Sequence, residues 1–172
     1  MDWLIFAANA FWLILPCYSA NFFPVLVKGK CPMDFKKKFP DGKRILGDGK
    51  TWEGFFAGII FGFSVGILQI AFQPYLPISL FKHSFFSILA LSLGALAGDC
   101  IGSFIKRRFG LRRGEFAPLL DQTDFLVFSL ILLKFFAEVD FLTVIFLILI
   151  TPFLHFLSNL FGFLFKLKKE PW

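Results

Sequence analysis

The stretch that decides the fold is GDCIGSFIKRR (Gly98–Arg108), which LLDQTD (Leu119–Asp124) follows closely. Asp99 lies inside an apolar helical run, and Asp121 and Asp124 lie where the next apolar run begins. A carboxylate inside a helix that spans hydrocarbon is costly, so it is a candidate for a functional site. Three such carboxylates beside a basic loop indicate a divalent metal ion that receives phosphate at a membrane surface.

The composition is that of a membrane protein. Of the 172 residues, 57% are hydrophobic and 17% are charged, and the mean hydropathy is +0.73. Soluble domains carry about a quarter charged residues. We therefore expect an all-α polytopic membrane protein that forms a single integral membrane domain over residues 1–172. The three cysteines are scattered without C-x-x-C spacing, which argues against a zinc site and against a disulfide framework.

Five apolar segments approach the length of about 20 residues that a transmembrane helix needs, and the fourth is the shortest. They are Trp3–Val27, Trp52–Phe72, Phe85–Ile105, Phe125–Phe136 and Phe141–Leu164.

The charges between these segments are distributed unevenly. The basic residues gather in the first loop (Lys28, Lys30, Lys36, Lys37, Lys38, Lys43, Arg44, Lys50), in the third loop (Lys106, Arg107, Arg108, Arg112, Arg113) and in the tail (Lys166, Lys168, Lys169). The positive-inside rule then predicts that both basic loops and the C-terminus are cytoplasmic and that the N-terminus is outside. Topology and attraction to anionic headgroups explain most of these lysines without any chemistry. We expect no nucleic-acid partner.

Glycines recur every four residues in the second segment, from Gly54 to Gly66, and in the third, from Gly94 to Gly102. Such faces let two helix backbones approach closely, so the pattern predicts helix packing that fixes the third segment against its neighbours.

The third segment also carries a polar face. Asp99, Ser103 and Lys106 are spaced i, i+4 and i+7 and therefore lie on one side of a helix. Asp121 and Asp124 are spaced i, i+3, so they share a face if both are helical. Two or three carboxylates from two helices, completed by nucleotide phosphates, satisfy Mg²⁺. Two simpler interpretations stay open: negative charge at a helix N-terminus for Asp121 and Asp124, and an ion pair of Asp99 with Lys106 or an arginine.

The segment GKRILGDGKTWEG (Gly42–Gly54) comes directly before and into the second apolar segment. A helix N-terminus with a preceding lysine is a ready anion site, although the spacing is not that of a Walker A loop.

Polar residues also occur in the first and fifth segments. Asn21 and Lys28 share a face of the first, and Pro24 predicts a kink there. Asn21 has two open interpretations, a hydrogen bond to a neighbouring helix or a contact to ligand. Thr151, His155, Ser158 and Asn159 of the fifth segment indicate interhelical hydrogen bonds or a protomer interface, so a homodimer is possible.

Two motifs resemble a known family. The residues Gly98, Asp99, Ser103, Lys106, Arg107, Gly110, Pro118, Asp121 and Asp124 resemble the signature of CDP-diacylglycerol synthases, the CTP:phosphatidate cytidylyltransferases. KTWEG (Lys50–Gly54) resembles the K-T-x-E-G element of the same family. The five segments and the Asn21-x-x-Pro24 pattern are similar to the archaeal branch, the CDP-archaeol synthases. The Pro-Gly-His-Gly-Gly run of the bacterial signature is absent before Asp121, and Arg112–Glu115 replaces its Lys-Asp pair.

The resemblance implies Mg²⁺-dependent transfer of the cytidylyl group of CTP to an isoprenoid glycerol ether lipid phosphate at the cytoplasmic face of the cell membrane. It implies Asp99, Asp121 and Asp124 as metal ligands, with Lys50 also catalytic. The remaining candidates are Lys43, Arg44, Lys50 and Thr51 for the triphosphate, Asn21 and Lys28 on the opposite wall, Ser103, Lys106 and Arg107 towards the lipid phosphate, and Glu53 as a partner that orients Lys50 or a metal-bound water.

Two other classes compete with this assignment. A small transporter or an assembly subunit could use an intramembrane Asp as an ion relay, but no repeat relates the two halves of the chain. A CDP-alcohol phosphotransferase would consume the CDP-lipid, but the D-G-x-x-A-R pattern of that family is absent.

Overall fold

The computed structural model describes residues 2–112, 115, 117 and 119–166, so Arg113, Pro118, Lys168 and Lys169 lie outside the described residues. The described part is helical and contains no strand. Its helices are α1 (Trp3–Phe22), α2 (Trp52–Phe72), α3 (Phe85–Arg108), α4 (Leu120–Leu133) and α5 (Phe141–Leu164), with 3₁₀ turns η1 (Phe23–Val25) and η2 (Gln73–Tyr75). The predicted all-α fold is confirmed.

Four of the helices, α1, α2, α3 and α5, are long and apolar enough to cross a membrane. Helix α4 has 14 residues, which at about 1.5 Å per residue gives roughly 21 Å, less than the hydrocarbon core of about 30 Å. It therefore crosses only part of that core by itself.

Side-chain caps fix where several helices begin. The Thr51 hydroxyl accepts the N–H of Gly54 at 3.2 Å and starts α2. Ser84 and Ser87 form a reciprocal capping box at the start of α3. Such caps satisfy N–H groups that have no partner inside the helix.

Helix ends differ by a few residues from the hydropathy boundaries. Helix α1 ends at Phe22, short of the expected Val27, because Pro24 has no N–H to donate and lies in the 3₁₀ turn η1 instead of kinking a continuous helix. Helix α3 continues to Arg108, and α4 begins at Leu120 instead of Phe125. Backbone hydrogen bonding does not stop where side chains become charged.

The glycine faces bring backbones into contact as predicted. A Cβ on Gly62 of α2 would lie 2.6 Å from the carbonyl oxygen of Pro16 in α1, and a Cβ on Gly98 of α3 would lie 2.5 Å from that of Asp124 in α4. Neither approach leaves room for a larger residue. Helix α3 is thereby held directly against α4.

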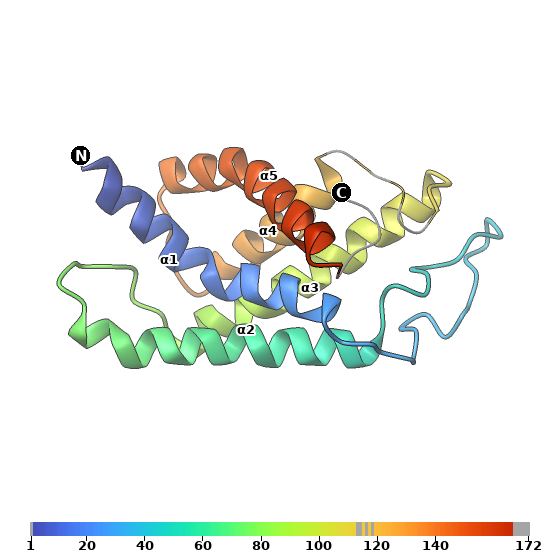
Figure 1. Cartoon of the computed structure of the whole chain (residues 1–172), viewed down its shortest axis with the longest axis horizontal. Helices are drawn as coiled ribbons and strands as arrows, with labels where there is room; N and C mark the ends of the chain where they lie inside the picture. Colours follow the sequence, from blue (N-terminus) through green and yellow to red (C-terminus); the bar gives the residue numbers. More distant parts are fainter. Residues whose placement is uncertain (1, 113–114, 116, 118, 167–172) are drawn as a thin grey trace.

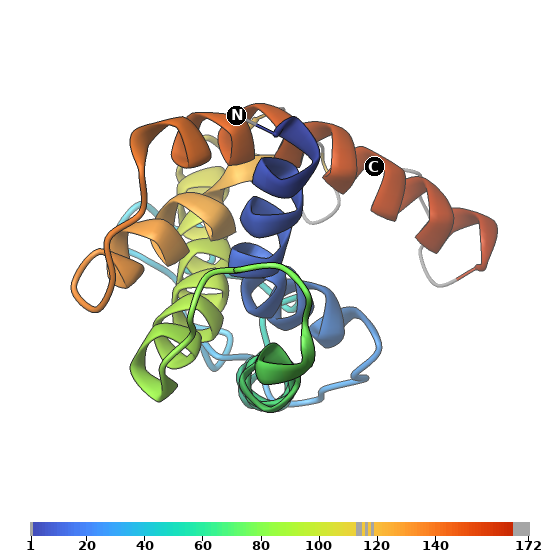
Figure 2. The ribbon, with the colours of Figure 1, turned by 90° about the vertical axis from the view of Figure 1, so that its left-hand side faces the viewer.

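The helices form one elongated bundle, with the N-terminus at one end and both basic loops at the other (Figure 1). Buried residues of α1, α3 and α4, among them Ile14, Leu91 and Leu126, form the core. Figure 2 shows that α5 lies across α4 and that its C-terminal half diverges from the other helices. The common end of the two basic loops is where the candidate site lies.

Candidate active site

A cavity of about 610 Å³ opens at the basic end of the bundle, between the end of α1, the loop before α2 and the last turns of α3. It brings together Asp99, predicted for the metal ion, and most of the side chains that the sequence predicted for phosphate binding. The latter are Asn21, Lys28, Lys50, Thr51, Ser103, Lys106 and Arg107.

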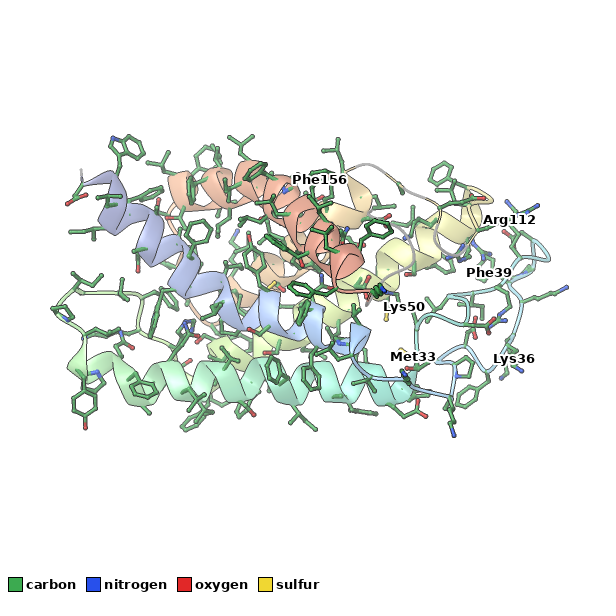
Figure 3. All side chains as sticks on the ribbon, viewed as in Figure 1. Met33, Lys36, Phe39, Lys50, Arg112 and Phe156 are labelled. Atoms are coloured by element: carbon green, nitrogen blue, oxygen red, sulfur yellow. The ribbon has the colours of Figure 1, made fainter. Side chains whose placement is uncertain are left out.

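Lys50 and Asp99 form an ion pair across this cavity. The Lys50 ammonium donates a hydrogen bond to Oδ2 of Asp99, and the two side chains are 24% and 31% exposed. Burial of the ammonium lowers its pKa, but the charge of Asp99 and its hydrogen bond outweigh burial, so the pKa of Lys50 lies above its ordinary value. The ion pair with Asp99 therefore favours the charged form of Lys50 in the cavity. Figure 3 shows it between the helix bundle and the basic loop, whereas Lys36 lies at the outer end of that loop.

Two more cations lie about two turns further along α3. Lys106 forms an ion pair with Asp121 of α4 at 2.5 Å. The Arg107 guanidinium donates to the carbonyl oxygens of Leu46, at 3.2 Å, and of Leu111. Both side chains are held in place while they line the cavity. Asp121 also accepts the N–H of Ala117 at 3.1 Å, so it closes the turn before α4.

Asp124 lies beneath these pairs. It is 7% exposed and its carboxylate packs against α3, where a Cβ on Gly102 would lie 1.9 Å from Oδ2. The charges of Asp99 and Lys50 both act on it. Gly102 thus supplies the space in which a carboxylate of α4 approaches the Asp99 face of α3.

These side chains fit Mg²⁺ only as an ion that substrate phosphates and water also bind. Within residues 2–112, 115, 117 and 119–166, no group of three or more His, Cys, Asp or Glu side chains is placed to hold a metal ion. The charge of Asp99 acts on Asp124, but Asp121 is turned to Lys106. Mg²⁺ commonly takes one or two carboxylates and completes its shell with water and substrate phosphates. Asp99 and Asp124 can supply that protein share.

Five predicted residues lie outside the cavity lining: the carboxylates Asp121 and Asp124 described above, and Lys43, Arg44 and Glu53. The Lys43 ammonium donates to the carbonyl oxygen of Arg108 at 2.8 Å. The Arg44 guanidinium forms ion pairs with Asp34 and Asp48 at 2.8 and 2.9 Å. Their binding of triphosphate stays a prediction.

Glu53 is also committed elsewhere. Its carboxylate accepts the backbone N–H groups of Lys30 and Cys31, both at 3.1 Å, so it fastens the beginning of the first basic loop to α2 and is not hydrogen-bonded to Lys50. Two features were not predicted from the sequence: Asp34 anchors Arg44 and the loop backbone, and Asp48 lines the cavity. The only available signal was the i, i+4 spacing of Arg44 and Asp48.

A second, mainly apolar cavity of about 240 Å³ lies beside the first, between α1, α4 and α5. The two cavities share Asn21, Val25 and His155. The Tyr18 hydroxyl and the Thr151 hydroxyl, 2.7 Å apart, form the predicted kind of interhelical hydrogen bond at its edge. The apolar cavity thus adjoins the polar one directly.

Comparison with known proteins identifies the family. A family model described as "CarS-like: CDP-archaeol synthase" matches residues 2–172. The chain belongs to the CDP-archaeol synthase family. It is 48% identical to the CDP-archaeol synthase of Pyrococcus abyssi over 95% of this chain and 97% of that protein. It is 44% identical to that of Thermococcus kodakarensis over the full length of both chains.

A solved structure shares the fold of this family member. That structure, described as an intramembrane enzyme for archaeal membrane lipid biosynthesis, superimposes with a TM-score of 0.77 at 38% identity and covers 88% of this chain and 93% of that chain. The family resemblance and the helical membrane fold predicted from the sequence are both confirmed.

Proposed function

We propose that this protein transfers the cytidylyl group of CTP to an isoprenoid glycerol ether lipid phosphate, forming CDP-archaeol and pyrophosphate. Family membership supports the reaction. The observation that carries the assignment to this site is the cavity itself, in which Lys28, Lys50, Lys106 and Arg107 surround Asp99 at the end of an apolar bundle. A transporter needs no such nucleotide-sized group of cations at one end of the bundle.

The reaction requires positioning more than proton transfer. The lipid phosphate is already an anion, so its oxygen attacks the α-phosphorus of CTP without a general base. A new P–O bond forms as the bond to the β-phosphate breaks, and pyrophosphate leaves with the electron pair. Fixed cations allow the two polyanions to meet and stabilise the leaving group. When bound, Mg²⁺ would add charge neutralisation at the triphosphate.

The residues divide this work by location. Lys50 and Thr51 lie at the N-terminus of α2 and suit the triphosphate. Lys28 and Asn21 face them from the end of α1. Asp99 and Asp124 suit the metal ion. Lys50 and Asp99 are paired with each other in this structure. When the nucleotide and the metal ion bind, this ion pair must therefore break, so that Lys50 contacts phosphate and Asp99 contacts the metal ion.

Lys106 and Arg107 suit the lipid phosphate because they lie on the last turns of α3, near the membrane surface. The adjoining apolar cavity between α1, α4 and α5 supports a path by which the isoprenoid tails extend into the bilayer.

We place the cavity on the cytoplasmic side of the membrane. The cations of the first and third loops lie at the cavity's end of the bundle, and the positive-inside rule places such loops in the cytoplasm. The N-terminus then lies outside and the C-terminus inside. A homodimer through α5 stays a prediction.

Purified protein in lipid vesicles tests the proposal with CTP, Mg²⁺ and the unsaturated ether lipid phosphate. We expect CDP-lipid and pyrophosphate, identified by mass spectrometry, in equal amounts. Release of CMP instead, or solute flux without nucleotide and no CDP-lipid, would overturn the assignment.

A further inference from the structure

Asp34 is the most completely bonded carboxylate among the described residues, although it lies outside the cavity. Its side chain has no exposed surface. Arg44 binds both of its oxygens, at 2.8 and 3.1 Å. The backbone N–H groups of Lys36, Leu46 and Gly47 donate to it at 3.0, 3.0 and 2.9 Å. Burial raises the pKa of Asp34, but these donors outweigh burial and hold the pKa well below its ordinary value.

One end of this network reaches Arg107. The carbonyl oxygen of Leu46, whose N–H binds Asp34, accepts the Arg107 Nε–H at 3.2 Å. The next residue, Gly47, has a φ of +96° and packs on the guanidinium, since a Cβ there would lie 3.4 Å from its Nε. The Asp34 carboxylate therefore fixes the two residues that hold Arg107 in the cavity wall.

The other end of the network reaches Lys50. Met33, directly before Asp34, donates its N–H to the carbonyl oxygen of Lys50 at 2.8 Å. Pro32 and Thr51 form an isolated β-bridge beside this hydrogen bond. Asp34 thus lies next to the point where the two segments of the loop are joined. Its carboxylate acts on Arg107 through Leu46 and Gly47, whereas its link to Lys50 runs only through the backbone of Met33.

We propose that Asp34 is a positioning residue for cytidylyl transfer, which acts through Leu46 and Gly47 to hold the Arg107 guanidinium at the lipid phosphate. This inference rests on the proposed function. Asp34 contacts no reacting atom and does not line the cavity. Its two oxygens are committed to five donors, so it has no free capacity for a metal ion or a nucleotide.

Asp34→Asn tests this role because it keeps the shape of the side chain and replaces an acceptor oxygen with an N–H donor that faces other donors. Loss of positioning by about 1 Å can cost a large factor in rate. We expect the KM for the lipid phosphate to rise about 10-fold or more, with a smaller change in the KM for CTP. Both constants are measured in vesicles of fixed composition.

A double-mutant cycle separates positioning from a general loss of stability. If Asp34 acts through Arg107, then Asp34→Asn changes the lipid KM less than about 2-fold once Arg107→Gln is present, because coupled residues are not additive. A merely structural role would lower the unfolding temperature and the active fraction, leave both KM values unchanged, and combine independently with Arg107→Gln. That result would overturn the proposal.

Asp41→Asn is the matched control. Asp41 belongs to the same loop, forms an ion pair with Arg108 at 2.7 Å and accepts the N–H of Lys43 at 3.0 Å, but none of these residues lines the cavity. We expect its lipid KM to equal that of the unmodified protein. Equal increases in the two variants would contradict the assignment.

Asp34→Glu serves if Asp34→Asn does not fold, since it keeps the charge and displaces the carboxylate by one methylene. An unchanged lipid KM in a folded Asp34→Glu protein would also overturn the proposal. Failure of the underlying function is distinguishable, because the unmodified protein would then form no CDP-lipid at all.

Discussion

Two carboxylates at the basic end of the molecule, Asp34 and Asp99, have opposite surroundings. Asp34 has no exposed surface and receives five donors, whereas Asp99 is 31% exposed and is paired with the Lys50 ammonium. A fully bonded carboxylate holds its neighbours in one arrangement. A carboxylate whose single partner is an exchangeable ammonium can bind another cation, such as a metal ion, in its place. The contrast separates Asp34, which we propose positions the site, from Asp99, which we propose binds the metal ion.

Asp99→Asn is expected to have the largest effect. It removes the charge that we assign to Mg²⁺, so turnover should fall at least about 100-fold, since a bound metal contributes several kcal/mol to transition-state stabilisation. Insertion and purification should be unaffected, because Asn has nearly the same size and shape as Asp and the side chain is partly exposed. Product formation measured beside Asp41→Asn tests this; full activity of Asp99→Asn would remove Asp99 from the metal site.

Lys50→Met should weaken nucleotide binding by about 10- to 100-fold, the range of a charge-assisted hydrogen bond of 1.5 to 3 kcal/mol. CTP-dependent thermal stabilisation with Mg²⁺ measures this. Lys36→Met is the matched control, because Lys36 lies in the same loop but is exposed at its outer end (Figure 3). Equal nucleotide affinity in the two variants would show that Lys50 pairs with Asp99 for structure alone.

Gly102→Ala should lower turnover by a smaller factor, about 10-fold or more. The new Cβ would lie 1.9 Å from Oδ2 of Asp124, so that carboxylate must move away from the face of Asp99. Gly66→Ala gives the comparison, since its Cβ would meet the Ile88 side chain at 2.4 Å and Gly66 does not line the cavity. The ratio of the two turnover numbers measures the requirement for the Asp124 position. A ratio near one would argue against a role for Asp124.

The smallest effect concerns acid stability. The pKa of Asp34 in the folded protein lies below its value in the unfolded chain, which is about 4. The ionised carboxylate therefore stabilises the folded state at a pH above about 4, and this stabilisation is lost as the pH falls further. The unfolding temperature should therefore begin to drop below about pH 5 and go on dropping as the pH falls towards the folded-state pKa of Asp34. Asp34→Asn should show a smaller drop. An identical pH dependence in both proteins would mean that other groups dominate.

Part of this contrast was predictable from the sequence. The spacing of Asp99, Ser103 and Lys106 placed them on one helical face, and that face lines the cavity. Hydropathy located the helices, and the glycine repeats predicted that the third helix packs closely against its neighbours. Helix periodicity and hydropathy are local properties, so they are visible in a single chain.

The partners of the charged residues were not predictable. The sequence indicates Lys106 or an arginine as a partner for an ion pair with Asp99, but Asp99 pairs with Lys50, 49 residues away. Asp34 pairs with Arg44 through an irregular loop in which Phe35 and Lys36 have positive φ values. No periodicity connects such positions, because the loop conformation alone decides which of many lysines and arginines meets which carboxylate.

The wall that the two cavities share, at Asn21, Val25 and His155, has a kinetic consequence. A water-soluble nucleotide and a bilayer lipid can approach each other there while each remains in its own phase. The rate should accordingly follow the mole fraction of the acceptor within the membrane, and dilution of that acceptor with inert lipid should slow the enzyme even when its bulk concentration is held constant.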